Sequence, residues 1–308
     1  MAMPTLLDIA KANGSDAVAG LIDEASKSHP EITLGFARTI KGINYKTLVR
    51  TGVPTGGSFR NANEGAATKK GTYENRLVET FTFNPRWECD KAVADRHEDG
   101  AAAFIALEAS AIMEGAMQDL AKQFYYGADA TYGNAKGFPG LLTAYDATNM
   151  VVDAAGTTDS TCSSAWLVRF SPKDIGWVWG NAGGLAMDDP REESITDAAT
   201  NRFTAYVQEM LAYPGLQVGS INSVVRIKKL TADSGKGLTD SLIYTALGKF
   251  PAGVVPDLML CTRRSLAQLR NSRTATNATG APAPMPTEVE GIPIRTTDAI
   301  SNVETLTL

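Results

Sequence analysis

The stretch NYKTLVRTG-VPTGGSFRNANEGAATKKGTYE-NRLVETFTFNPRW, residues 44–87, decides the fold. Its two ends, 44–52 and 75–87, are rich in β-branched and aromatic residues and partly alternate, which predicts strands. The middle has glycine at four positions and only Val53 and Phe59 as apolar anchors. An unstructured connection of this length is uncommon inside a compact domain. We therefore expect a long hairpin that leaves the globule and lies on another surface.

The clearest helix in the sequence follows the hairpin, over residues 100–124. Apolar side chains recur there at steps of three and four residues, as one face of a helix requires, namely Phe104, Ile105, Ala111, Ile112, Ala116, Leu120 and Phe124. A helix of this length is a rod of about 37 Å. Gly127 ends it.

Ahead of the hairpin, residues 4–12 and 15–28 predict two short helices. His29-Pro30 ends the second one, because the residue before a proline avoids the helical region. The two helices form an arm that leads into the body. Neither the arm nor the hairpin can bury its apolar side chains alone. We therefore expect both to pack on adjacent copies, as in a symmetric homo-oligomer.

The rest of the chain mixes helices and strands, which predicts an α+β fold. Helices are expected at 239–250 and 262–270, and a loop containing a hairpin at 186–201. Residues 274–287 are rich in proline and predict a further loop. β-prone stretches predict six strands, at 164–170, 174–180, 203–213, 219–230, 292–295 and 304–308.

Composition excludes several classes of protein. The chain has 308 residues, 44% of them hydrophobic and 20% charged, which is the balance of an ordinary globular protein. No run approaches the roughly 20 apolar residues of a membrane span, so no membrane partner is expected. The net charge of −5 argues against a dedicated nucleic-acid binder, although a mildly acidic wall can enclose DNA without gripping it. Three scattered cysteines predict buried, reduced thiols.

Candidate catalytic and metal sites are few. His97 lies in ADRHEDG, where consecutive polar residues point in different directions on a helix, so we interpret them as a polar cluster at a helix start. Residues 232–240 lack the first glycine and the Ser or Thr of a phosphate loop and predict a turn. The acidic run 188–193 has oxygen ligands for a divalent cation but is more typical of a solvated face. We expect no catalytic residue, no cofactor, no metal site and no enzymatic activity.

Several stretches in this order resemble the major capsid proteins of tailed bacteriophages, whose fold was first seen in the phage Hong Kong 97. The resemblance covers nearly the whole chain, and it rests on TIKGINYKTLVRTGVP (39–54), FRNANEG (59–65), QFYYG (123–127), GFPGLL (137–142), SSAWLVRF (163–170), GLQVGSINSVVRIKKL (215–230) and GIPIRTTDAI (291–300). No stretch is a chemical motif by itself, so the joint order carries the resemblance.

The resemblance implies an α+β capsid fold with five parts. These are an N-terminal arm (1–38), an extended loop called the E-loop with its flanking strands (39–91), a peripheral domain with a spine helix (92–139), a mainly axial domain (140–290) and C-terminal strands that return to the body (291–308). It also implies assembly in the host cytoplasm into pentamers and hexamers of an icosahedral shell that encloses double-stranded DNA. Expected partners are a portal, a scaffolding protein separate from this chain, possible decoration proteins and non-specifically contacted DNA.

The hairpin of one subunit is then expected to lie across its neighbour. Charged residues would set the register, and two apolar residues would add buried contact. The expected contact residues are Val53, Phe59, Arg60, Glu64, Lys69, Lys70, Glu74 and Arg76. An exposed lysine can form an isopeptide bond with a neighbour, but no partner is evident, so we interpret Lys69 and Lys70 as surface charges that meet acidic neighbours.

Three alternative functions remain open at this point. An encapsulin-type nanocompartment that holds a cargo enzyme would have the same fold. An acidic-residue hydrolase would need convergent carboxylates in a pocket, for which Asp188 and Asp189 are the candidates. Another phage structural part, such as a tail tube, is the third.

Overall fold

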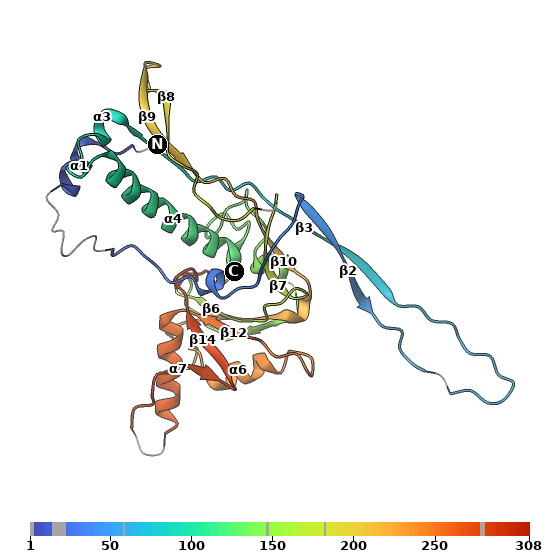
Figure 1. Ribbon diagram of the computed structural model, residues 1–308. Coiled ribbons are helices and arrows are strands. Elements are labelled where there is room, and N and C mark those ends of the chain that lie inside the picture. Colours follow the sequence, from blue (N-terminus) through green and yellow to red (C-terminus); the bar gives the residue numbers. More distant parts are fainter. Residues whose placement is uncertain (1–2, 14–22, 58, 146–147, 182, 278–280) are drawn as a thin grey trace.

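The computed structural model describes residues 3–13, 23–57, 59–145, 148–181, 183–277 and 281–308. An elongated body carries one long hairpin that projects far from it (Figure 1). The hairpin strands are β2 (Asn44–Gly52) and β3 (Thr72–Glu79), as the sequence predicts for 44–52. No helix in these described ranges is long and apolar enough to cross a membrane.

The largest layer is a six-stranded mixed sheet in the order β13-β14-β12-β6-β11-β5. Strand β6 is buried along its whole length, and its last four residues, AWLV, are apolar without alternation. Helices α6 (Asp240–Leu247) and α7 (Arg263–Ala275) pack beside the sheet, each capped by a threonine hydroxyl. The strands are β5 (Val151–Asp153), β6 (Ser163–Val168), β11 (Val224–Leu230), β12 (Leu258–Cys261), β13 (Glu288–Val289) and β14 (Ile292–Thr296).

A second, three-stranded sheet has the order β1-β7-β10, with β1 (Ala37–Thr39), β7 (Ile175–Trp179) and β10 (Pro214–Val218). Strands β6 and β7, which follow each other in the sequence, therefore belong to different sheets. A 3-10 turn (Ile221–Ser223) leads from β10 into β11. The short helix α5 (Leu141–Tyr145) lies against α4 and β11.

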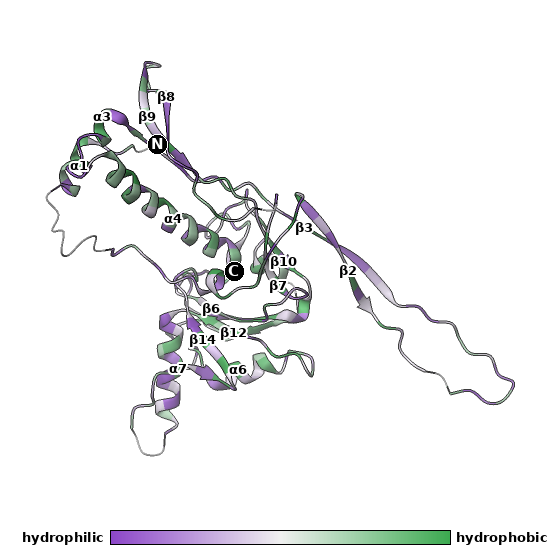
Figure 2. Ribbon diagram, viewed as in Figure 1, coloured by the Kyte–Doolittle hydropathy of each residue, from purple (hydrophilic) through white to green (hydrophobic). Residues whose placement is uncertain are grey.

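The long helix predicted at 100–124 is confirmed as α4 (Ala101–Tyr126). Its C-terminal half is buried in the main core, whereas its N-terminal half buries only Phe104. Figure 2 shows hydrophobic colouring over much of α4 and hydrophilic colouring over much of α7. A third sheet flanks the distal part of α4 in the order β4-β9-β8, with β4 (Arg86–Asp90), β9 (Arg202–Glu209), β8 (Arg191–Thr196) and the short α3 (Lys91–Ala94) beside it.

The arm differs from its prediction in two ways. Helix α1 (Leu6–Ala12) is confirmed. It was expected to pack its apolar side chains on an adjacent copy, but it buries Ile9 against Trp87 and Phe104 of its own subunit. Of the helix predicted at 15–28, residues 14–22 lie outside the described residues and 23–28 are not helical. Instead, helix α2 (Pro30–Thr33) begins at the proline, which suits the first turn because it needs no N–H there.

Four strand predictions differ from the structure. Strand β9 ends at Glu209 rather than at 213, and the strand predicted at 219–230 begins only at Val224, after the 3-10 turn. The run 75–87 splits into β3 and β4, because Phe81 and Phe83 turn away to bond the chain beside β10, through Pro214 and Ala212. The strand predicted at 304–308 does not form. Glu304 makes a single bridge with Cys162, since its side chain is drawn into the core.

Candidate functional site: the projecting hairpin and its anchor

The ladder of the hairpin has two faces of different exposure. Strands β2 and β3 are antiparallel, with Asn44 opposite Glu79 and Arg50 opposite Tyr73. Residues directly opposite each other share a face. One face lies toward the body and the other is open to solvent.

The inner face ties the root of the hairpin to the body. The hydroxyl of Tyr45 donates to Gln217 Oε1 at 2.5 Å, and Arg76 donates to the carbonyl of Gly219 at 3.1 Å. The guanidinium of Arg38 lies 3.9 Å from the centre of the Tyr45 ring, and Val78 is buried. These contacts fix the direction in which the hairpin leaves the body.

The outer face carries large apolar side chains that the described residues of the subunit leave about half exposed or more. Leu48 is 67% exposed, Tyr73 59% and Leu77 48%. Two cations lie beside them, Lys46 opposite Leu77 and Arg50 opposite Tyr73. A single exposed apolar residue is ordinary, but several on one projecting face mark an interaction surface.

The loop beyond the ladder is held in shape by its own polar contacts. The ammonium of Lys69 donates to the carbonyls of Thr55 and Gly56, which ties the two sides of the loop together. Nearer the tip, Arg60 donates to the carbonyl of Glu64 at 2.6 Å, and the Glu64 carboxylate accepts the backbone N–H of Asn61 at 2.9 Å. The tip is thus preorganised, which lowers the entropy lost on binding.

The predicted contact residues do not all belong to one surface. Val53 is 65% exposed and Phe59 is fully exposed, so both are available to a partner. Arg60 and Glu64 come together in the tip, and Lys70 and Glu74 are exposed. Two cations are engaged with their own chain, Lys69 with the loop carbonyls and Arg76 with Gly219.

Sequence reasoning missed the outer face of the ladder, which consists of Lys46, Leu48, Arg50, Tyr73 and Leu77. The signal was present in the period-two alternation of β2, where the exposed and half-buried positions take turns. Alternation alone does not say which of the two faces meets the body. Only the contacts of Tyr45 and Arg76 decide it.

The second functional element is the stretch QFYYG at the end of α4, residues 123–127. Its first residue, Gln123, is buried and holds the following loop. Its amide donates to the carbonyls of Asn134 and Phe138, and its carbonyl oxygen accepts the N–H of Asn134. Phe124 stacks on Trp177 with ring centres 5.4 Å apart. This stretch therefore joins the spine helix to the sheets.

Tyr125 anchors the N-terminal segment through Glu31. The Glu31 side chain has no exposed surface. It accepts hydrogen bonds from the Tyr125 hydroxyl at 3.2 Å and from the Thr297 hydroxyl at 3.3 Å. Burial raises the pKa of Glu31 to about 7, although its hydrogen bonds oppose that change and nearby Asp298 adds to it. Burial likewise raises the pKa of Tyr125.

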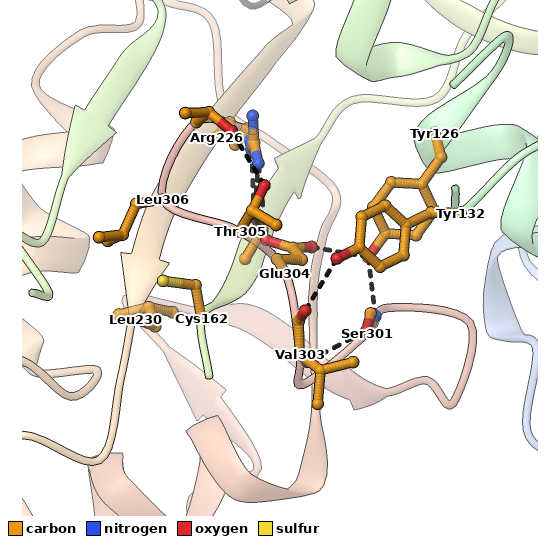
Figure 3. Close-up of polar contacts among 12 residues, drawn as sticks. Tyr126, Tyr132, Cys162, Arg226, Leu230, Ser301, Val303, Glu304, Thr305 and Leu306 are labelled. Atoms are coloured by element: carbon orange, nitrogen blue, oxygen red, sulfur yellow. Dashed lines mark hydrogen bonds and ion pairs between the residues drawn. The ribbon is translucent and has the colours of Figure 1, made fainter. Parts of the chain in front are cut away.

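Tyr126 anchors the C-terminal segment through Glu304 (Figure 3). The Tyr126 hydroxyl donates to Glu304 Oε1 at 2.6 Å, and Ser164 donates to Oε2 at 2.7 Å. The guanidinium of Arg226 lies 3.6 Å from Oε2 and also donates to Ser164. Arg226 and Glu304 are 1% and 2% exposed, so this is a buried ion pair closed by hydrogen bonds.

Gly127 lets the chain turn sharply at the end of α4. Its φ is +57°, a left-handed conformation that favours glycine. A Cβ at this position would overlap the backbone of Gly140, and one at Gly140 would overlap Gly127. The stretches QFYYG and GFPGLL therefore pack backbone to backbone, which explains the glycine in each.

The other candidate sites have structural roles. The ring nitrogen of His97 accepts the N–H of Asp99 and its ring lies near Phe104, as expected for a polar cluster at a helix start. Within 188–193, Glu192 pairs with Lys91 at 2.6 Å. Residues 232–240 form a turn, and Asp233 is bonded there by Thr157 and Thr158. Those hydrogen bonds lower the pKa of Asp233 to about 2.

The described part of the chain shows neither a metal-binding cluster nor a cavity lined by several carboxylates. It contains no group of three or more His, Cys, Asp or Glu arranged to hold a metal ion. The three cysteines are free and buried, as predicted, and burial raises the pKa of Cys261 to about 12. A cavity of about 370 Å³ lies between Phe81, Leu120 and Phe138, and its single carboxylate is Asp119. It does not include Asp188 or Asp189.

Comparison with known proteins identifies the family. The model of the family described as major capsid protein GP7 matches residues 33–307, nearly the whole chain. The chain belongs to this family. It is a tailed-phage major capsid protein, the subunit of the phage head, located in the capsid of the virion. The nanocompartment and tail-tube alternatives are set aside by this match. Among curated proteins, none matches the chain.

Solved structures confirm the fold. A chain in the near-atomic structure of bacteriophage Epsilon15 is similar over 99% of this chain and 97% of its own, with 23% identity and a TM-score of 0.76. The capsid of the Myoviridae phage XM1 has 10% identity and a TM-score of 0.49, with 71% of this chain and 97% of that one covered. An encapsulin from Synechococcus elongatus has 9% identity and a TM-score of 0.48, with 76% and 98% covered. The α+β capsid fold of the Hong Kong 97 type is therefore confirmed, on the Epsilon15 match.

Proposed function

We propose that this capsid protein builds an icosahedral shell of pentamers and hexamers around double-stranded DNA, and that the hairpin of each subunit lies across a neighbour. The observation that carries the proposal is the hairpin itself. It is anchored at its root by Tyr45 and Arg76, tied in shape by Lys69, and leaves large apolar side chains uncovered. A subunit that acted alone would gain nothing from such a surface.

The free energy gained by burying the apolar side chains of one hairpin is modest, but the total over all subunits of a shell is large. Burying one large apolar side chain stabilises by about 1.5–3 kcal/mol. Phe59, Leu48, Leu77, Tyr73 and Val53 are the side chains that would be buried. Ordering costs reduce that gain at each contact. A closed shell repeats the contact in every subunit, so weak single contacts add up to high avidity.

The five-part division extends the proposal. Residues 1–38 act as the arm, 39–91 as the E-loop, 92–139 as the peripheral domain, 140–290 mainly as the axial domain and 291–308 as the returning C-terminal segment. The role is structural, without catalysis or cofactor. Assembly takes place in the host cytoplasm, and the partners are a portal, a scaffolding protein, decoration proteins and DNA held without sequence preference.

Deletion of residues 56–72 tests the role of the hairpin. The variant is expected to keep the thermal stability of the native subunit, because the loop buries no part of the core. It is expected to form no stable shells under conditions where the native chain forms them, as seen by negative-stain electron microscopy and size exclusion.

A single substitution with a matched control sharpens the test. Phe59→Ser removes the apolar residue at the loop tip, and Val303→Ser removes another exposed apolar residue, 58% exposed, far from the hairpin in the sequence. Shell yield should fall for Phe59→Ser and stay unchanged for Val303→Ser. Normal particles from the deletion variant would contradict the proposal.

A further inference from the structure

The segment that leads from the arm into the body, residues 25–34, is held to α4 by polar contacts. The Gln118 side chain donates to the carbonyl of Ala25 at 2.9 Å, and the Glu114 carboxylate accepts the N–H of Lys27 at 3.0 Å. Both hydrogen bonds are exposed, so water can replace them and each stabilises the contact only weakly. Residues 25–34 are called the latch segment below.

A second set of contacts joins the latch segment to the C-terminal segment. The N–H of Ser28 donates to the Asp298 carboxylate at 3.2 Å, and the Ser28 carbonyl accepts the N–H of Asp298 at 3.2 Å. The Thr297 hydroxyl donates to the same carbonyl at 3.3 Å. The N-terminal and C-terminal segments of the chain therefore meet at the latch segment.

Burial holds the latch segment at two residues. Within it, only Pro30 and Glu31 are buried, whereas Ile32 is half-buried and Leu34 is 53% exposed. A segment with so few buried apolar contacts opens at a lower free-energy cost than global unfolding. Because one of its two buried residues is a carboxylic acid, the protonation of that acid strongly affects whether the segment stays closed.

We propose that the latch segment is a pH-sensitive device, which stays closed while the Glu31 carboxyl is protonated and opens when Glu31 ionises, while the rest of the subunit remains folded. The contacts of the Glu31 side chain are the hydroxyls of Tyr125 and Thr297, which carry no positive charge to balance a carboxylate. Trp177 of β7 bonds only the backbone carbonyl of Glu31, at 2.9 Å. Opening transfers the ionised carboxylate into water, where it is stable. The device lies within one subunit and does not depend on the proposed shell.

The groups around Glu31 favour opening at high pH. Burial raises the pKa of Glu31 to about 7, and repulsion by the Asp298 carboxylate adds to this change. Burial also raises the pKa of Tyr125 on α4, which therefore stays neutral over this range. On the latch segment itself, a protonated His29 attracts the Glu114 carboxylate of α4. Loss of that proton at higher pH weakens closure in the same direction.

The size of the effect follows from the two states of Glu31. In the open segment the carboxyl has its ordinary pKa of 4.5, whereas in the closed segment its pKa is about 7. The open state holds the proton less tightly, so opening is favoured as the pH rises from 4.5 to 7 and levels off above 7. Between pH 5.5 and 8, the equilibrium constant for opening should increase about 25-fold.

Hydrogen exchange followed by mass spectrometry measures the opening in the full-length subunit. Peptides over residues 29–36 report on the latch segment, and peptides over 163–168 report on β6 in the core. The native chain and Glu31→Gln are compared at the same pH, so that the intrinsic exchange rates cancel. The ratio of native to variant exchange in the latch segment should rise about 25-fold from pH 5.5 to pH 8, and the ratio in β6 should stay constant. Glu24→Gln, at an exposed carboxylate just ahead of the latch segment, is the control and should exchange like the native chain.

Equal exchange of the native chain and Glu31→Gln at pH 8 overturns the inference, because the carboxyl then does not control opening. An equal rise in the latch segment and in β6 also overturns it, since both would then exchange through global unfolding. Asp298→Asn gives a second measurement. It keeps an oxygen acceptor for Ser28 but removes the repelling charge, so opening should level off at a lower pH than in the native chain. An unshifted profile overturns the inference even if Glu31→Gln does not fold.

Discussion

Glu31→Gln is expected to change how the free energy of unfolding depends on pH. Glu31 is fully buried and contacts Tyr125 of α4, Thr297 of the C-terminal segment and, through its backbone carbonyl, the indole N–H of Trp177. No cation is among these contacts. The native carboxyl must therefore be protonated to be stable there, whereas glutamine keeps the shape and stays neutral at every pH.

The size of the effect follows from the pKa. A folded value of about 7 against an ordinary 4.5 means that the folded state holds the proton more tightly than the unfolded state. The stabilisation is complete below pH 4.5, declines as the pH rises toward 7, and is lost above it. At 1.36 kcal/mol per pH unit, about 3 kcal/mol of the free energy of unfolding disappears over that interval.

Urea unfolding followed by tryptophan fluorescence, at pH 4.5, 5.5, 6.5 and 8, measures the difference between native chain and variant. The free energy of unfolding of the native chain should fall relative to Glu31→Gln by about 3 kcal/mol from pH 4.5 to 8. Glu24→Gln, at an exposed carboxylate of the same segment, is the matched control and should show a constant difference. A constant difference for Glu31→Gln as well would refute the reasoning, since it would mean that the buried carboxyl ionises freely.

Two further substitutions probe the anchor at 123–127. Glu304→Gln removes a carboxylate from the buried guanidinium of Arg226 while Arg226 stays charged, so the free energy of unfolding should fall by about 3–5 kcal/mol in chemical denaturation; a loss under 1 kcal/mol would contradict a stabilising role of this ion pair. Gly127→Ala forces a Cβ into Gly140 at a left-handed φ, so the protein should lose several degrees of melting temperature or fail to fold. Gly115→Ala is the control within α4, where a Cβ meets open space, and should instead stabilise by about 0.5–1 kcal/mol in the same thermal melt.

The elements that the sequence predicts well are those with a strong local pattern. The spine helix shows its apolar period over seven turns, and the hairpin shows two alternating runs around a glycine-rich connection. Run 75–87 failed as one strand because alternation continues through Phe81 and Phe83, although the chain there leaves β3 to bond Pro214 and Ala212. The residues around Phe81 and Phe83 contain no sequence pattern that would predict this change of strand partner.

The anchor could not be predicted because its parts lie far apart in sequence. Glu31 and Tyr125 are 94 residues apart, and Tyr126 and Glu304 are 178 apart. A carboxylate that ends up buried looks like any other acidic residue in a loop. The stretch QFYYG contributed to the family resemblance only through its sequence. Its role as an anchor is evident only in the folded chain, where Glu31 and Glu304 contact its two tyrosines.

Folding and assembly use charge in opposite ways in this subunit. At the end of α4, adjacent tyrosines hold the N-terminal and C-terminal segments through buried carboxyls, and the one charged pair there, Arg226 with Glu304, is shielded from salt and any neighbour. On the hairpin, charge is exposed and hence weak, tunable and sensitive to salt. A subunit that folds alone and joins a shell later needs this separation, because a contact strong enough to hold the fold together would also trap subunits in wrong positions. Weak exposed charges allow errors to dissociate while the buried anchor keeps each subunit intact.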